Sequence, residues 1–149
     1  MLVRELLEKK GRLIHSISGE QSVAEAIRSL TEKRISALLI LDDDRLQGIF
    51  TERDVLRCTV KFPDQDFAAI PVRDVMSTKL IVAELGDELA ATMSMMIQAD
   101  IRHLPVIDQG RLMGLLSIRD LVQQVVGSIT AELHYLQSYI VDLREAAID

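Results

Sequence analysis

Apolar residues recur at intervals of three and four positions near the start of each half of the chain. The positions with this spacing are Val23, Ala26, Ile27 and Leu30 in the first half and Leu89, Met93, Met96 and Ile97 in the second. Such spacing is typical of a helix with one buried face, and Ser22 directly precedes the first set, as a helix cap does. The pattern therefore predicts one amphipathic helix in each half.

Two short apolar runs follow each of these helices. They cover 37–41 and 46–50 in the first half, and 104–107 and 112–116 in the second. Runs of this length suit buried strands, and the polar residues between them, Asp42 to Asp44 and Asp108 to Gly110, favour a turn. We therefore expect a β-hairpin in each half, followed by a second helix that opens at Thr51 or Ser117.

The two halves repeat one plan at a constant offset of 66 residues. Between 42–55 and 108–121, six positions are identical and most of the others pair apolar with apolar residues. At the front, 3–7 resembles 72–76 with a slip of three residues. One copy of about 60 residues would be marginally stable alone. We therefore expect one pseudo-symmetric α+β domain, built from two strand-helix-strand-strand-helix units packed sheet to sheet.

The repeat also sets the boundaries between units within the chain. We assign the first repeat to residues 1–60, a linker to 61–71, the second repeat to 72–127 and a C-terminal amphipathic helix to 128–149.

Each second helix opens with a hydroxyl, an arginine and an aspartate. These residues are Thr51, Arg53 and Asp54 in the first half and Ser117, Arg119 and Asp120 in the second. A helix N-terminus attracts anions through its free N–H groups and dipole. The hydroxyl and the guanidinium suit a phosphate, and a carboxylate can accept hydrogen bonds from a ribose diol. Together they indicate recognition of a ribose phosphate.

The same residues have a purely structural interpretation. A hydroxyl followed three residues later by an acid is a capping box, with Asp in place of the usual Glu or Gln. The arginines could be ordinary solvated charges. A cap and a ligand can share one helix terminus, so the residues alone leave both interpretations open.

The segments 101–108 (Ile-Arg-His-Leu-Pro-Val-Ile-Asp) and 114–121 (Gly-Leu-Leu-Ser-Ile-Arg-Asp-Leu) resemble a cystathionine-β-synthase-type (CBS) repeat, and 35–42 and 48–55 resemble it more loosely. Together the halves resemble a CBS pair, or Bateman module, over about residues 1–125. The resemblance implies an α+β fold in which two sheets face each other. It also implies an adenosine ligand: AMP, ADP, ATP, NAD(H) or S-adenosylmethionine.

The resemblance assigns roles residue by residue. Asp54 and Asp120 would hold ribose hydroxyls, and Thr51 and Ser117 would hold phosphate. The candidate phosphate partners are Arg53, Arg119, Arg102 and His103. Adenine would lie near Ser16, Ala37 and Leu38 in one site, and near Met76, Val82, Leu104 and Pro105 in the other.

The two halves differ where the base would lie. The first carries Ala37 and Leu39 in place of His103 and Pro105. We expect the first site to differ in geometry, although both sites keep the hydroxyl, arginine and acid and are expected to bind.

Composition narrows the class of protein. A net charge of −6 argues against a general nucleic-acid binder. The single cysteine, Cys58, cannot form an intrachain disulfide. We find neither the pattern of a signal peptide nor an apolar run long enough for a membrane span, and we expect a cytoplasmic protein. No metal-ligand spacing or catalytic constellation is evident. We therefore expect neither an enzyme nor a catalytic cofactor.

The tail carries a heptad-like stripe. Its members are Ile129, Leu133, Leu136, Ile140, Leu143 and Ala147. Such a helix either folds back on its own domain or joins two copies, and we favour a homodimer. A leading helix over 3–10, ended by Gly11, is expected to pack on the other repeat.

The function that follows is a sensor that binds an adenosine nucleotide and acts on a separate effector protein. The alternative is a structural or interaction dimer with no physiological nucleotide.

Overall fold

The structure is a computed structural model that describes residues 1–148, with side chains described for residues 1–138. The first repeat contains β1 (Ser16–Ser18), α2 (Val23–Lys33), β2 (Ala37–Asp42), β3 (Arg45–Thr51) and α3 (Glu52–Lys61). The second contains α4 (Leu89–Ala99), β4 (His103–Asp108), β5 (Arg111–Ser117) and α5 (Ile118–Ile148). Helix α1 (Val3–Lys10) precedes them, and the short 3-10 helices η1 (Phe67–Ala69) and η2 (Val72–Asp74) lie in the connection.

The predicted helices and hairpins are confirmed. Helix α2 begins after Ser22, whose hydroxyl accepts a hydrogen bond from the N–H of Glu25 at 3.1 Å. The turn between β2 and β3 places Asp43 and Asp44 at φ values of 49° and 63°. Two consecutive positive φ values are typical of the turn whose twist matches that of a hairpin. The polar residues of this turn therefore fix the register of both strands.

The second sheet is smaller than the first, and the predicted first strand of the second repeat is wrong. The first sheet has the order β1-β2-β3, whereas β4 pairs with β5 and receives only an isolated bridge from Ala83 to Val106. In the first repeat the N–H of Leu39 donates to the carbonyl of His15 at 3.0 Å. The equivalent residue is Pro105, which has no N–H to donate. The strand is thereby shortened to one bridge.

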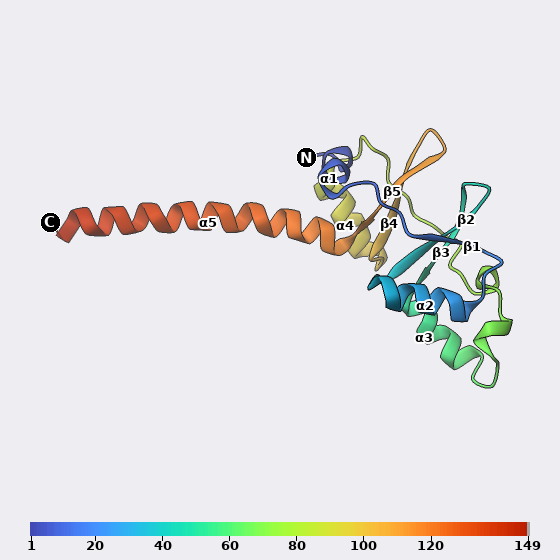
Figure 1. Cartoon of the computed structure of the whole chain (residues 1–149). Coiled ribbons are helices and arrows are strands. Elements are labelled where there is room, and N and C mark those ends of the chain that lie inside the picture. The colour runs from blue at the N-terminus through green and yellow to red at the C-terminus, as the bar shows by residue number, and fades with distance from the viewer. Residues whose placement is uncertain (149) are drawn as a thin grey trace.

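The two sheets face each other, as the repeat predicts (Figure 1). An apolar cluster joins them and consists of Ala37, Leu39 and Ile49, packed against Ile14, Leu46, Leu80, Leu112 and Leu115. Side chains alternate along a strand, so Leu38 and Ile40 point the other way, into the core of the first repeat with the buried Cys58. Helices α2 and α3 lie beside the first sheet, and α1 and α4 beside the second.

Helix α1 packs on the second repeat, as expected. Val3, Leu6 and Leu7 are buried in one core with α4, β4, β5 and the start of α5. The helix ends at Gly11, whose φ of 91° favours glycine. The first residues of the chain thus complete the core of its second half.

Helix α5 runs continuously from Ile118 to Ile148 and projects from the body (Figure 1). The predicted C-terminal helix is therefore present, but it continues the helix that opens at Ser117 instead of starting after residue 127. Ile129, Leu133 and Leu136 are about half exposed. Ile140, Leu143 and Ala147 lie outside the residues whose side chains are described. Within residues 1–148, we find no helix with the length and apolar character that crossing a membrane requires.

Candidate ligand-binding site

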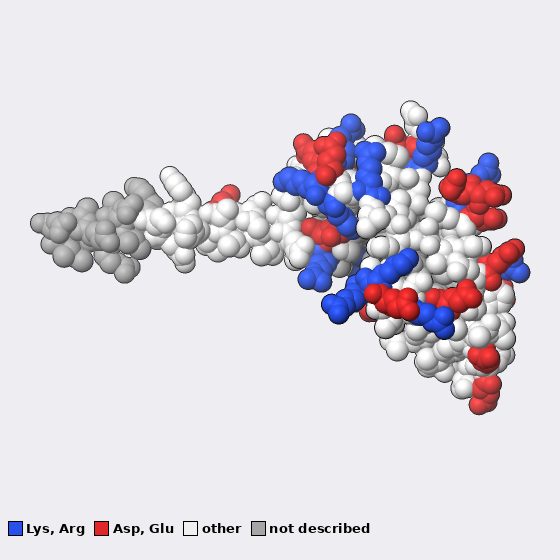
Figure 2. Space-filling view, in the orientation of Figure 1, with Lys and Arg blue, Asp and Glu red and all other residues white. Residues whose placement is uncertain are grey.

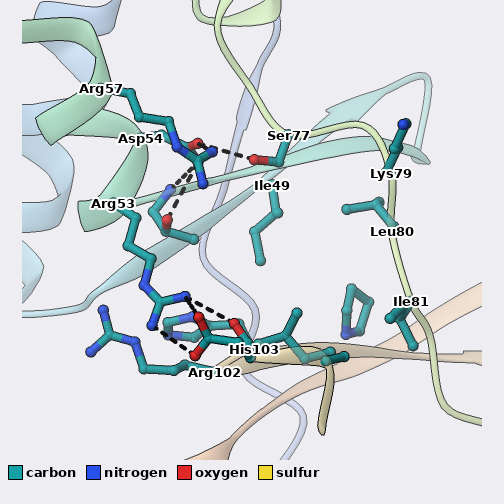
Figure 3. Close-up of a pocket in the computed structure, with 15 residues that line it drawn as sticks. Ile49, Arg53, Asp54, Arg57, Ser77, Lys79, Leu80, Ile81, Arg102 and His103 are labelled. Atoms are coloured by element: carbon teal, nitrogen blue, oxygen red, sulfur yellow. Dashed lines mark hydrogen bonds and ion pairs between the residues drawn. The ribbon is translucent and has the colours of Figure 1, made fainter. Parts of the chain in front are cut away.

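A pocket of about 370 Å³ lies where the two repeats meet (Figure 3). The first repeat contributes Thr51, Arg53 and Asp54 at the entrance to α3. The second contributes two segments, Ser77 to Ile81 and Ala99 to Pro105. We call this the α3 pocket. In this pocket the helix entrance of one repeat faces the segment of the other repeat near which the base is expected.

Asp54 forms the floor of the α3 pocket and is only 2% exposed. Its Oδ2 accepts from the backbone N–H of Thr51 at 2.9 Å, which is half of the predicted capping box. Its Oδ1 accepts from the hydroxyl of Ser77 at 3.0 Å and from the guanidinium of Arg57 at 3.1 Å. The capping interaction fixes the carboxylate at the helix entrance, and Ser77 holds it toward the second repeat.

Arg53 spans the pocket between the repeats. Its guanidinium donates to the backbone carbonyl of Asp100 at 2.9 Å and reaches the carboxylate oxygens of that residue at 3.4 Å. Asp100 ends α4 in the left-handed conformation, with φ of 52°. Arg53, which we predicted to contact phosphate, therefore lines the pocket, and in this structure an acid from the other repeat pairs with it.

Other basic side chains line the α3 pocket. Lys79 lies across the pocket from Asp54, and Arg102 lies on the same side as Arg53 (Figure 3). Among the described residues, neither Lys79 nor Arg102 forms an ion pair. The apolar part of the lining comes from Ile49, Leu80, Ile81, Ile101 and Pro105. The pocket thus combines cations, a buried acid and an apolar wall.

His103 separates the α3 pocket from a second pocket, and it lines both. Its Nε2 lies 2.8 Å from the hydroxyl of Ser36. Burial, together with the positive charges of Arg102 and Lys10, lowers the pKa of His103 to about 4. The imidazole is therefore neutral near pH 7 and can either donate or accept a hydrogen bond, depending on its tautomer.

The second pocket, of about 720 Å³, contains Ser117 and Arg119 at the entrance to α5. We call it the α5 pocket. His103 and Leu115 of the second repeat also line it, and the remaining wall comes from the first repeat and α1, including Lys10, His15, Arg34, Ser36 and Ala37. Asp120 completes the capping box with Ser117, through bonds of 2.8 and 3.1 Å. However, its carboxylate lies in an adjacent shallow hollow with Leu6 and Lys9, where the ammonium of Lys10 contacts it at 2.6 Å.

Five predicted base-binding residues lie elsewhere. Leu38 and Leu104 are fully buried, with side chains in the cores of their repeats. Met76 packs beside Gly48, Val82 lies in a hollow with Arg4, and Ser16 is exposed on β1. Strand alternation explains the first two, because Ala37 and His103 occupy the cleft-facing positions next to them. Ala37, Pro105 and His103 do line the pockets.

Comparison with known proteins identifies the repeats. The profile of the CBS domain matches residues 5–61 and 72–127. The chain belongs to the CBS domain family.

A mitochondrial CBS domain-containing protein of Arabidopsis thaliana, CBSX3, is 32% identical over 126 residues, or 81% of this chain. The match spans 61% of that relative's length. A putative signal-transduction protein with CBS domains from Burkholderia ambifaria is 36% identical, with a TM-score of 0.79 over 85% of this chain and 95% of that one. The CBS domain protein PAE2072 from Pyrobaculum aerophilum, solved in complex with AMP, is 25% identical, with a TM-score of 0.70 over 80% of this chain and 89% of that one.

Sequence reasoning missed four polar residues of the CBS pair. Arg57 stands one helical turn after Asp54, a spacing at which side chains meet, so the sequence contains a signal for it. Ser77 and Asp100 reach the α3 pocket only because the repeats pack face to face. Lys10 reaches Asp120 only because α1 joins the second repeat. Local patterns contain no signal for these three contacts.

Proposed function

We propose that this CBS pair is a regulatory module that binds an adenosine nucleotide in the α3 pocket. The observation that carries the proposal is the convergence of Thr51, Arg53 and Asp54 on one pocket whose opposite wall belongs to the other repeat. A hydroxyl, a guanidinium and a buried carboxylate are the groups that a ribose phosphate requires.

The ribose would bind at Asp54. Its diol offers two O–H donors, and Oδ1 of Asp54 is held by Arg57 and Ser77. The side chain of Arg57 is 69% exposed, so it can move into solvent and leave its place at Oδ1 to a ribose hydroxyl. Ser77 would still donate to Oδ1, and Thr51 would keep Oδ2 in position.

The phosphate would bind toward Arg53 and the entrance of α3. There the N-terminus of the helix and the Thr51 hydroxyl face the pocket. Arg102 and Lys79 add positive charge from the second repeat. The base would lie on the apolar wall that contains Ile81 and Pro105. The proposed adenosine contacts are common to AMP, ADP, ATP, NAD(H) and S-adenosylmethionine, and the phosphate contacts are available to all of these except S-adenosylmethionine.

A ligand in the α3 pocket would contact both repeats, because the lining comes from both. Binding would therefore favour one relative placement of the repeats, to the extent that the ligand prefers it. We propose that a separate effector protein recognises this placement and that the pair itself catalyses no reaction. The AMP complex of the Pyrobaculum relative supports an adenosine ligand.

We also propose that two copies associate through α5. Val122, Val126, Ile129, Leu133 and Leu136, which we call the α5 stripe, are 42–54% exposed and follow each other at intervals of four, three, four and three residues. This spacing is that of a coiled-coil seam. The face of the helix in Figure 2 carries few charged side chains along its described part. A second copy would cover the stripe with an identical one.

Thermal unfolding with AMP, ADP, ATP, NADH and S-adenosylmethionine tests nucleotide binding. A ligand at 100 times its dissociation constant should stabilise the protein by about 2.7 kcal/mol. Asp54→Asn should lose this stabilisation. Asp44→Asn, in the β2–β3 turn, should keep it, because Asn also tolerates the positive φ found there.

Failure of all five ligands at millimolar concentration would contradict the proposal and favour the alternative, a structural dimer. Steady conversion of any of these nucleotides would contradict the non-catalytic role.

A further inference from the structure

The α3 pocket and the α5 pocket differ in how their aspartates are held. Ser77, at the start of the second repeat, contacts two acceptors of the first repeat. Its N–H donates to the carbonyl of Ile49 at 2.9 Å, and its hydroxyl donates to Asp54 at 3.0 Å. Neutral groups of Ser77 thus hold β3 and Asp54 of the first repeat.

The same two acceptors recur in the second repeat, 66 residues later, as the carbonyl of Leu115 and the carboxylate of Asp120. There one ammonium contacts both groups, although on the carboxylate it contacts the oxygen that also accepts from the Ser117 N–H, whereas Ser77 contacts the other oxygen of Asp54. The Nζ of Lys10 donates to the Leu115 carbonyl at 2.6 Å and to Asp120 Oδ2 at 2.6 Å. The acid of the second repeat is therefore held by a full positive charge that also satisfies the strand.

Helix α1 fixes Lys10 in this position. The N–H of Val3 donates to the carbonyl of Asp87 at 2.9 Å, and that of Arg4 donates to the carbonyl of Leu85 at 3.1 Å. Leu7 packs so closely on Gly114 that a Cβ there would lie 2.5 Å from its Cδ1. Because α1 is anchored at three points, the ammonium is placed beside Asp120 with little loss of backbone freedom.

The two aspartates differ in how easily a ribose could displace their cations. Arg57 is 69% exposed and has no other partner within the described residues, so it can leave without breaking a second contact, and Thr51 and Ser77 still bond to Asp54. The side chain of Lys10 is less exposed, at 33%. Moving Lys10 would break its pair with Asp120 and also remove a donor from the Leu115 carbonyl.

The electrostatics of Asp120 agree with a tight pair. Partial burial alone would raise the pKa of its carboxyl, but hydrogen bonds from Lys10 and Ser117 and the charge of Lys10 lower it overall. The carboxylate is thus ionised and its charge is already compensated.

We infer that Lys10 is a specificity-determining residue that occupies the Asp120 carboxylate beside the α5 pocket, so that the chain binds one adenosine nucleotide, in the α3 pocket. This inference rests on the proposed function. It replaces the expectation that both sites bind.

Calorimetric titration with AMP tests the inference through its stoichiometry. The wild-type chain should bind one equivalent, and Lys10→Ala should bind two, because Asp120 becomes available. Lys9→Ala is the matched control, since it removes a neighbouring ammonium of the same helix turn, and it should still bind one. The double variant Asp54→Asn, Lys10→Ala should bind one equivalent, now in the α5 pocket.

Two equivalents on the wild type, or one on Lys10→Ala, would overturn the assignment. If Lys10 were a phosphate contact, Lys10→Ala would lose an equivalent, which would also overturn it. Absence of binding to the wild type would overturn the proposed function instead. In that case the double variant decides the role of Lys10 separately: one equivalent supports it, and none refutes it.

Discussion

Arg53 of the first repeat is bonded to Asp100 of the second, at 2.9 Å to the backbone carbonyl and 3.4 Å to the carboxylate. This pair closes one side of the α3 pocket and links the two repeats (Figure 3). A phosphate in the pocket would therefore compete with the Asp100 carboxylate for the same guanidinium.

Asp100→Asn should strengthen AMP binding severalfold, because the guanidinium loses its charged competitor. Asn tolerates the left-handed conformation at this helix end, and an exposed ion pair contributes about 0–1 kcal/mol, which is at most about fivefold in affinity. Adenosine, which has no phosphate, serves as the control ligand and should bind equally to both proteins. Calorimetry measures both affinities, and equal strengthening for adenosine and AMP would contradict the competition.

His103 should make stability depend on pH. Its pKa is about 4 in the folded protein and about 6.5 in an unfolded chain. Between these values the unfolded chain binds more protons, so the free energy of unfolding falls as pH falls from the higher to the lower value. The slope is at most about 1.4 kcal/mol per pH unit. Urea unfolding of His103→Gln should show a shallower dependence than wild type, and parallel curves would contradict the assignment.

Gly48→Ala should disturb Met76 and Ser77, at the start of the second repeat beside the α3 pocket. A Cβ at this position would lie 2.6 Å from Sδ of Met76 and 2.8 Å from the carbonyl oxygen of Ser77. We expect a loss of about 1–3 kcal/mol in the free energy of unfolding and weaker AMP binding, since Ser77 must move. Gly86→Ala is the control, because the nearest atom there is 3.6 Å away. Equal stability of the two variants would contradict this expectation and show that Met76 and Ser77 can move without a loss of stability.

Leu133→Glu should dissociate the proposed dimer. The substitution places a charge in the middle of the α5 stripe, where a partner helix would bury it. Ala131→Glu adds the same charge on the opposite side of the helix and should leave the dimer intact. Sedimentation velocity gives the mass of each protein. If wild type is a monomer, or if both variants behave alike, association does not run through the stripe.

The hydrophobic pattern was sufficient to predict the hairpins and most of the helices, because each depends on local spacing and turn chemistry. It failed where one residue changes the pairing of a strand. Pro105 carries the apolar side chain that a strand favours, yet it lacks the N–H through which Leu39 holds β1 in the first repeat.

The sequence predicted several of the residues that line the pockets, but not which residues contact one another there. Arg53 and Asp54 line the same pocket. Arg119 lines the α5 pocket, whereas Asp120 lies in the adjacent hollow and is paired with Lys10. Which residues share a pocket depends on how the two repeats pack against each other. The hydrophobic periodicity of one repeat contains no information on this packing. The continuous α5 has a similar origin, since Gly127 weakens a helix locally without ending it.

A crystal structure of the protein with AMP tests the central claim most directly. We predict the ribose hydroxyls within hydrogen-bonding distance of Asp54 and the phosphate beside Arg53 and Thr51, with Arg57 displaced. A nucleotide bound elsewhere, with Asp54 still bonded to Arg57 and Ser77, would contradict the account.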